Sequence, residues 1–237
     1  MMLWGLWVDP LYLVLFIATL LISGAAQMYI RSTFAKWDRV SNSAGLAGML
    51  VGQKLVQEVT FGQARGSATG ISFRIVPGNL SDHFDPRTLQ IGLSQEVASR
   101  DSVAAMAVTA HEVGHAQQHA EGTVAMRARA FLVPAVTFSP MLSYLLIFVG
   151  LIFNLTGLFW MGIIVFGLMV LFSVLTLPVE IGASRRALVM LRETGMLARP
   201  QDEEGVKRVL TAAALTYVAA AVTAILTLLY YISIARR

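Results

Sequence analysis

Three of the four histidines in the chain, His111, His115 and His119, recur at a spacing of four residues. A helix brings residues four positions apart onto one face, about 6 Å from each other, so two imidazoles at this spacing can bind one metal ion. Glu112 directly follows the first histidine, where a carboxylate can take a proton from metal-bound water. The segment HEVGH therefore matches the His-Glu-x-x-His pattern of zinc hydrolases. The competing interpretation is a solvated polar face on an Ala-rich helix.

The pattern requires a third ligand, because a catalytic zinc usually has three protein ligands and one open position. His119 lies about 12 Å along the helix axis from His111, and one helix cannot place three collinear side chains around a tetrahedral ion. The metzincin spacing would need a histidine where this chain has Glu121. Glu180 is the better candidate, since it is the first charge after the uncharged run 130–179. The alternative is a carboxylate that only marks the end of a membrane span.

Composition indicates a membrane protein that crosses the bilayer several times. The chain is 56% hydrophobic and has a mean hydropathy of +0.67, well above an ordinary soluble domain. Each crossing needs about 20 apolar residues. MMLWGLWVDP has no Lys or Arg before the first apolar stretch, so we expect a retained anchor rather than a signal peptide. Four apolar runs are long enough to span the membrane: 10–30, 131–153, 157–179 and 209–235. The sequence NLTG divides the second run from the third.

The basic residues predict the orientation of these spans. Ten of the 18 Lys and Arg lie between Arg31 and Arg129, six lie between Arg185 and Arg208, and two end the chain. With four spans the first two groups share one side, which the positive-inside rule makes cytoplasmic. Anionic headgroups and orientation explain the net charge of +4, so no nucleic-acid partner is expected. The absence of cysteine excludes disulfides and thiolate metal sites.

The fold class that follows is mainly α, a polytopic membrane protein with about four transmembrane helices and a small α+β cytoplasmic zinc-metallopeptidase domain. The expected divisions are an N-terminal transmembrane anchor (1–30), a cytoplasmic metallopeptidase domain with the HEVGH helix (31–130), a transmembrane hairpin ending at Glu180 (131–180), a cytoplasmic segment (181–208) and a C-terminal transmembrane helix (209–237).

Within the cytoplasmic domain, apolar periodicity predicts a helix over 41–59. Alternating segments at 71–76 and 88–94 predict a small sheet of two or three strands, and PGNLSDHFDPR between them is typical of a turn. The Ala-rich stretch 102–120 predicts the motif helix, which stops at Gly122. An edge of the sheet, at 71–76 or 88–94, could bind an extended substrate as an added strand.

Three segments carry a resemblance to a known family. In chain order they are DHFDPRTLQIGLSQEV, AVTAHEVGHAQQHA and LPVEIGASRRAL. Together they resemble the bacterial neutral zinc metallopeptidase family of membrane proteins, the YugP-type peptidases, over nearly the whole chain. A more distant similarity is to HtpX and the CAAX prenyl protease gluzincins.

The resemblance implies a gluzincin-like site in which His111, His115 and Glu180 bind Zn²⁺ and Glu112 is the general base. Ser184 stands where the distant relatives have Asp, and Gly182 stands where closer ones have Asp. Ser184, one turn after Glu180, can hydrogen-bond a ligand and orient it.

These residues predict a zinc-dependent endopeptidase in the cell membrane, with its active site facing the cytoplasm. Its expected partners are a peptide or membrane-protein substrate and the lipid bilayer. Candidates for stabilising the tetrahedral oxyanion are His83 and Arg185 or Arg186, and the alternative for His83 is a turn or capping residue.

Three rival functions share parts of this pattern. A non-catalytic scaffold or chaperone could keep a structural zinc. A metal-dependent hydrolase of another substrate class would have the same site chemistry. A metal transporter is disfavoured, because 131–179 contains no His, Asp or Glu to line a path through the membrane.

Overall fold

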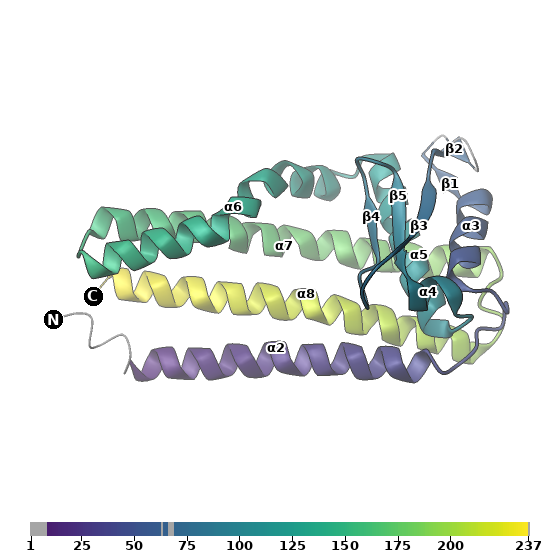
Figure 1. The fold of residues 1–237 in the computed structure, drawn as a ribbon, viewed down its shortest axis with the longest axis horizontal. Coiled ribbons are helices and arrows are strands. Elements are labelled where there is room, and N and C mark those ends of the chain that lie inside the picture. Colours follow the sequence, from purple (N-terminus) through teal and green to yellow (C-terminus); the bar gives the residue numbers. More distant parts are fainter. Residues whose placement is uncertain (1–8, 63, 66–68, 237) are drawn as a thin grey trace. The chain divides into compact units, whose positions relative to one another are not determined.

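The computed structural model describes residues 9–62, 64–65 and 69–236, and its ribbon is mainly helical (Figure 1). The chain divides into two compact units, each assembled from separate stretches of sequence. Unit 1 comprises the described residues of Met1–Gln27, Arg127–Leu177 and Thr216–Arg237. Unit 2 comprises those of Met28–Met126 and Pro178–Leu215.

In the described part of the chain, four helices are long and apolar enough to cross a membrane, which confirms the expected number of spans. They are α2 (Pro10–Trp37), α6 (Val124–Ile152), α7 (Thr156–Glu193) and α8 (Pro200–Ala235). All four helices extend beyond the uncharged runs. A helix can continue into a polar segment, because its backbone hydrogen bonds do not depend on the polarity of the side chains. In particular, α7 does not end at Glu180 but continues to Glu193.

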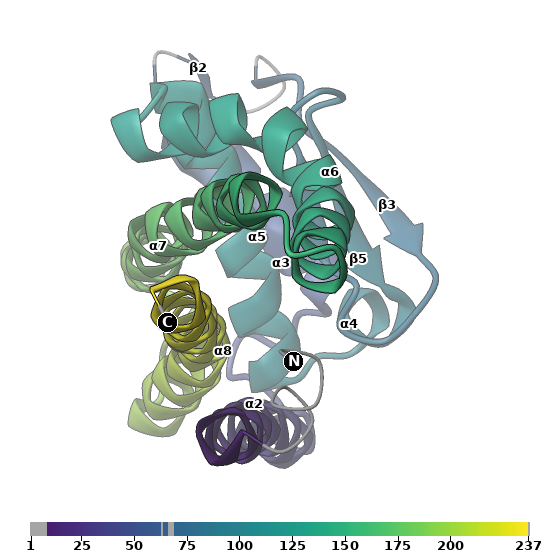
Figure 2. The same cartoon turned by 90° about the vertical axis from the view of Figure 1, so that its left-hand side faces the viewer.

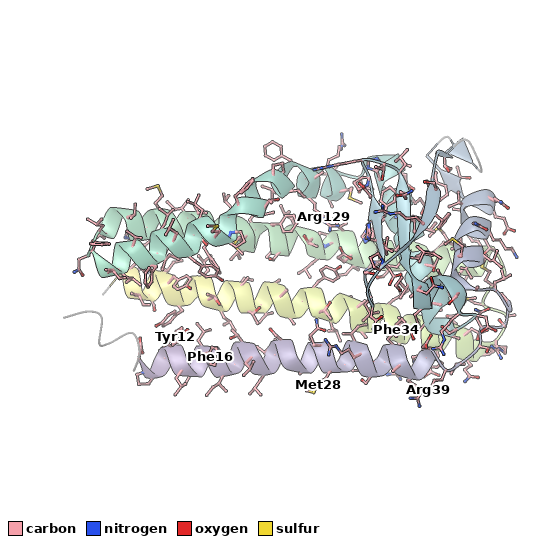
Figure 3. All side chains as sticks on the ribbon, viewed as in Figure 1. Tyr12, Phe16, Met28, Phe34, Arg39 and Arg129 are labelled. Atoms are coloured by element: carbon pink, nitrogen blue, oxygen red, sulfur yellow. The ribbon has the colours of Figure 1, made fainter. Side chains whose placement is uncertain are left out.

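Unit 1 contains the apolar parts of these helices, and Figure 2 looks along them. Aromatic rings join α2 to α8, since the ring centroids of Tyr12 and Tyr230 lie 5.6 Å apart. Tyr12 is labelled in Figure 3. The hairpin of α6 and α7 is close-packed: a Cβ added at Gly150 would lie 2.6 Å from the backbone nitrogen of Phe159. The turn between them includes Asn154 at a φ of 54°. It lies where NLTG predicted it.

Unit 2 contains a hydrophobic core of buried side chains, to which three shorter helices contribute. They are α3 (Gly48–Glu58), α4 (Gln95–Ser99) and α5 (Val103–Glu121). Helix α5 follows its prediction closely, since the Ser102 hydroxyl accepts from the Ala105 N–H as its N-cap and Gly122 ends it at a φ of 60°. Helix α3 begins later than predicted. Asn42 closes a loop instead, exchanging side-chain hydrogen bonds with the backbone N–H and carbonyl of Leu46.

The described strands form two small sheets. In the three-stranded sheet the order is β3–β5–β4, with β5 (Gln90–Ser94) parallel to β3 (Ser72–Val76) and antiparallel to β4 (His83–Asp85). A short antiparallel ribbon joins β1 (Thr60–Phe61) to β2 (Ala64–Arg65).

Two details of the sheet differ from expectation. The segment 88–94 was a candidate edge, and this was wrong, because β5 is the central strand and the edges are β3 and β4. The segment around His83 was assigned to a turn, yet His83–Asp85 forms β4. Three residues carry too little alternation to predict a strand, and the pairing partner on β5 determines its conformation.

Candidate metal centre

Helix α5 and the part of α7 that belongs to unit 2 bring together two histidines and one glutamate. His111 and His115 come from consecutive turns of α5, and Glu180 comes from α7. Glu180 Oε2 lies 3.2 Å from His111 Nε2 and 3.3 Å from His115 Nε2. His115 and Glu180 are buried, and His111 is partly buried. The two histidines thus each direct one nitrogen, and the glutamate one oxygen, at a common point.

Small residues allow α5 and α7 to approach closely beside this point. A Cβ added at Gly114, between the two histidines, would lie 2.6 Å from the backbone oxygen of Ala183. Ala183 and Ala187 on α7 are themselves completely buried. The glycine in HEVGH is therefore a packing requirement of the helix pair, and it allows Glu180 to reach the two imidazoles.

Each histidine has a second partner at its other ring nitrogen. Ser184, one helical turn after Glu180, places its Oγ 3.2 Å from His111 Nδ1. Gln118 Oε1 lies 3.1 Å from His115 Nδ1, and Gln118 Nε2 donates to the backbone oxygen of Val179 over 2.8 Å.

Sequence reasoning did not single out Gln118. The available signal was its position three residues after His115, which places both on one face of α5. Glutamine side chains are common on helix surfaces, however, and only the structure shows that this one is 4% exposed.

Glu112 is buried next to the first histidine and belongs to no ion pair that the structure shows among the described residues. Burial raises its pKa to about 7, the negative charges of Asp82 and Glu180 add to this increase, and His111 opposes it. A carboxyl group with such a pKa can both accept and release a proton near neutral pH.

His83 lies outside the group of three potential ligands. It is exposed on β4, and its Nδ1 is 2.8 Å from the Ser81 carbonyl oxygen. Its ring covers Gly92 of β5, where an added Cβ would lie 2.8 Å from His83 Cε1.

The remaining polar candidates lie outside the group of three. His119 packs its ring against Phe84, with centroids 5.7 Å apart. Glu121 forms a two-pronged ion pair with Arg186, each contact being 2.7 Å. Arg185 is exposed on α7. The structure therefore does not bring His119 or Glu121 into the group formed by the other three side chains.

Comparison with known proteins agrees with this geometry. Residues 12–236 match the model of a family described as "Putative neutral zinc metallopeptidase". The chain belongs to this family. It is 36% identical over 224 residues to "Putative membrane protease YugP" of Bacillus subtilis (strain 168), covering 94% of this chain and 96% of that protein. No solved structure matches the chain.

A zinc metallopeptidase implies a zinc ion, and the donor set of this member fits one. Two imidazole nitrogens and a carboxylate oxygen are ordinary zinc ligands, with bond lengths of about 2.0–2.2 Å. Tetrahedral coordination at such lengths separates neighbouring donors by roughly 3.3 Å. The oxygen-to-nitrogen distances of 3.2 and 3.3 Å agree with that value. The four apolar helices make this member of the family a membrane protein.

Proposed function

We propose that the chain is a zinc-dependent endopeptidase that hydrolyses peptide bonds in membrane or membrane-proximal proteins. The observation that carries this proposal is the convergence of His111, His115 and Glu180, with the buried carboxyl group of Glu112 directly after the first of them. These three side chains would hold a zinc ion, which would supply the Lewis acidity needed to activate water and polarise the scissile carbonyl.

Glu112 is the general base in this mechanism. It accepts a proton from the attacking water and passes it to the leaving amine, without a covalent intermediate. Its burial supports the role, because loss of solvation raises the pKa of a carboxyl group and makes the carboxylate a stronger base. Glu112 is also adjacent to a proposed ligand without being one of the three converging groups.

His83 is the proposed contact for the negative charge that develops on the carbonyl oxygen. Its Nδ1 faces the Ser81 carbonyl, which leaves Nε2 as the nitrogen available to a substrate. The exposed side chain is accessible to an incoming peptide, and the pairing of its strand with β5 supports its backbone. A hydrogen bond from Nε2 to the carbonyl oxygen would stabilise the transition state.

We place the active site on the cytoplasmic side of the cell membrane. The support is the charge distribution: sixteen of the 18 Lys and Arg lie in the two segments between Arg31 and Arg129 and between Arg185 and Arg208. The proposed partners are a peptide or membrane-protein substrate and the lipid bilayer, with no nucleic acid.

The test compares wild type with Glu112→Gln in purified membranes, measuring zinc content and the fragments of co-expressed membrane proteins. Glu112→Gln should retain zinc and lose about 100-fold or more of the proteolysis, because the base is removed and the ligands remain. Glu58→Gln, at a 42% exposed side chain on α3, is the matched control and should cleave normally.

Two results would count against the peptidase. Unchanged cleavage by metal-replete Glu112→Gln protein would exclude the assigned base. If wild type bound zinc and melted on chelation but never produced fragments, the zinc would be structural and the protein a scaffold or chaperone.

A further inference from the structure

We propose that Gln118 is a positioning residue, which fixes the tautomer and ring orientation of His115 and ties that ring to the backbone beside Glu180. The proposal rests on the proposed metal site and deepens it. Gln118 is buried at 4% exposure, so its amide has no solvent to satisfy it. Both ends of the amide meet protein partners: Oε1 lies 3.1 Å from His115 Nδ1, and Nε2 lies 2.8 Å from the Val179 oxygen.

The direction of both hydrogen bonds follows from the chemistry of the Val179 carbonyl group. A backbone carbonyl can only accept, so the NH₂ group of Gln118 must face Val179. The amide oxygen therefore faces His115, and an oxygen of this kind can only accept. His115 must donate from Nδ1, which leaves the lone pair of Nε2 free to bind a metal. Nε2 is the nitrogen that lies 3.3 Å from Glu180 Oε2.

The space for this amide depends on a glycine of the facing helix. A Cβ added at Gly182 would lie 2.6 Å from Gln118 Nε2. Any side chain at 182 would therefore displace the amide from its position beside Val179. Gly182 on α7 and Gln118 on α5 therefore form a matched pair.

The other histidine is held differently. Ser184 Oγ lies 3.2 Å from His111 Nδ1, but a hydroxyl group can donate or accept by rotating. Ser184 therefore supports His111 without determining its tautomer. Gln118 alone of these two partners enforces the proton position, and it links His115 to the residue that precedes Glu180.

The experiment measures zinc affinity by competition with a chelator, together with the visible absorption spectrum of the cobalt-substituted full-length protein. Gln118→Leu should weaken zinc binding about 10–100-fold, the range for partners that orient a metal ligand. It should also alter the cobalt spectrum, which a change in overall stability would not move. Gln118→Glu keeps an acceptor for His115 and loses the donor to Val179, so its loss should be smaller than that of Gln118→Leu.

Two further variants keep the test decisive. Gln117→Leu, one residue earlier on α5, removes hydrogen bonds to Thr60 and Arg186 but none to a proposed ligand, so it should bind zinc normally. Gly182→Ala keeps glutamine at position 118 but displaces its amide, so it should reproduce the spectral change even where Gln118→Leu fails to fold.

Wild-type zinc affinity and an unchanged cobalt spectrum in Gln118→Leu and Gly182→Ala would overturn the positioning role. This outcome is distinguishable from failure of the proposed function. Zinc affinity and the cobalt spectrum need no substrate, whereas the peptidase assignment stands or falls on the fragments lost in Glu112→Gln.

Discussion

The two halves of α7 satisfy their polar groups in opposite ways. In residues 156–177 the hydroxyl groups of Ser173 and Thr176 donate to carbonyls one turn earlier in the same helix, over 2.9 and 2.8 Å. In residues 178–193 Glu180, Ser184 and Arg186 all engage side chains of α5. The apolar half is self-sufficient, as a helix in lipid must be. The polar half depends on a partner helix.

Glycines on α7 have very different surroundings. Apart from the neighbouring backbone of its own helix, a Cβ added at Gly167, in the apolar half, would meet no described atom within 4 Å. In the polar half, Gly182 faces Gln118, and Gly114 on α5 faces Ala183. Gly162, also in the apolar half, is closely packed, because an added Cβ would lie 2.8 Å from the backbone nitrogen of Ile147 on α6. A glycine on α7 therefore determines the helix approach only where another helix faces it. The same Gly→Ala substitution should therefore change the stability of the protein by very different amounts at different positions.

The largest effect should come from removing the glutamate of the polar half. Glu180→Ala deletes one of three proposed ligands, so zinc affinity should fall by more than the roughly 100-fold upper range for outer partners. Thr176→Val, one turn earlier in the apolar half, removes only a bond within the helix and should leave affinity unchanged. Chelator competition on both purified variants measures the difference. Equal affinities would break the comparison and exclude Glu180 as a ligand.

The next effect concerns the close approach of α5 and α7. Gly114→Ala would place a methyl group 2.6 Å from the Ala183 oxygen. The helices must then separate, which should lower the free energy of unfolding by about 1–3 kcal/mol. Gly167→Ala has open space and should be neutral or stabilising by about 0.5–1 kcal/mol. Denaturant unfolding in detergent compares the two. A stabilised Gly114→Ala protein that retains zinc would show that the helices are not in this contact.

The smallest effect should come from Ser184→Ala. The hydroxyl group orients His111 without determining its tautomer, so zinc affinity should fall by less than the about 10–100-fold expected for Gln118→Leu. Ser173→Ala, in the apolar half, should not change affinity at all. The same chelator assay ranks all three variants. A larger loss for Ser184→Ala than for Gln118→Leu would reverse the ranking of the two supports.

Much of this arrangement could be predicted from sequence because it depends on spacing and polarity. The spans follow from uncharged runs, α5 from its caps, and the pair His111 and His115 from helical periodicity. The spatial proximity of Glu180 to that pair was an expectation from topology, and the structure brings the three side chains together. Their roles as ligands stay predictions.

Other features could not be predicted, because they depend on what lies opposite a residue. Gln118 is an ordinary helix residue until Val179 and Gly182 face it. The strand β4 is too short to carry a pattern of its own, and its conformation comes from pairing with β5. The continuation of α7 to Glu193 likewise reflects packing of its polar half against α5, which a hydropathy plot cannot show.

The distance along the chain between the proposed ligands has a consequence for biosynthesis. His111 precedes Glu180 by 69 residues, and the α6–α7 hairpin is translated between them. At about 5–20 residues per second, roughly 3 to 14 seconds separate the synthesis of the first ligand from that of the last. A nascent chain therefore carries HEVGH for seconds without the carboxylate that completes the group. Under the proposed ligand set, hydrolytic activity begins only after the hairpin has been made, so an unfinished chain cannot cut its neighbours on the ribosome.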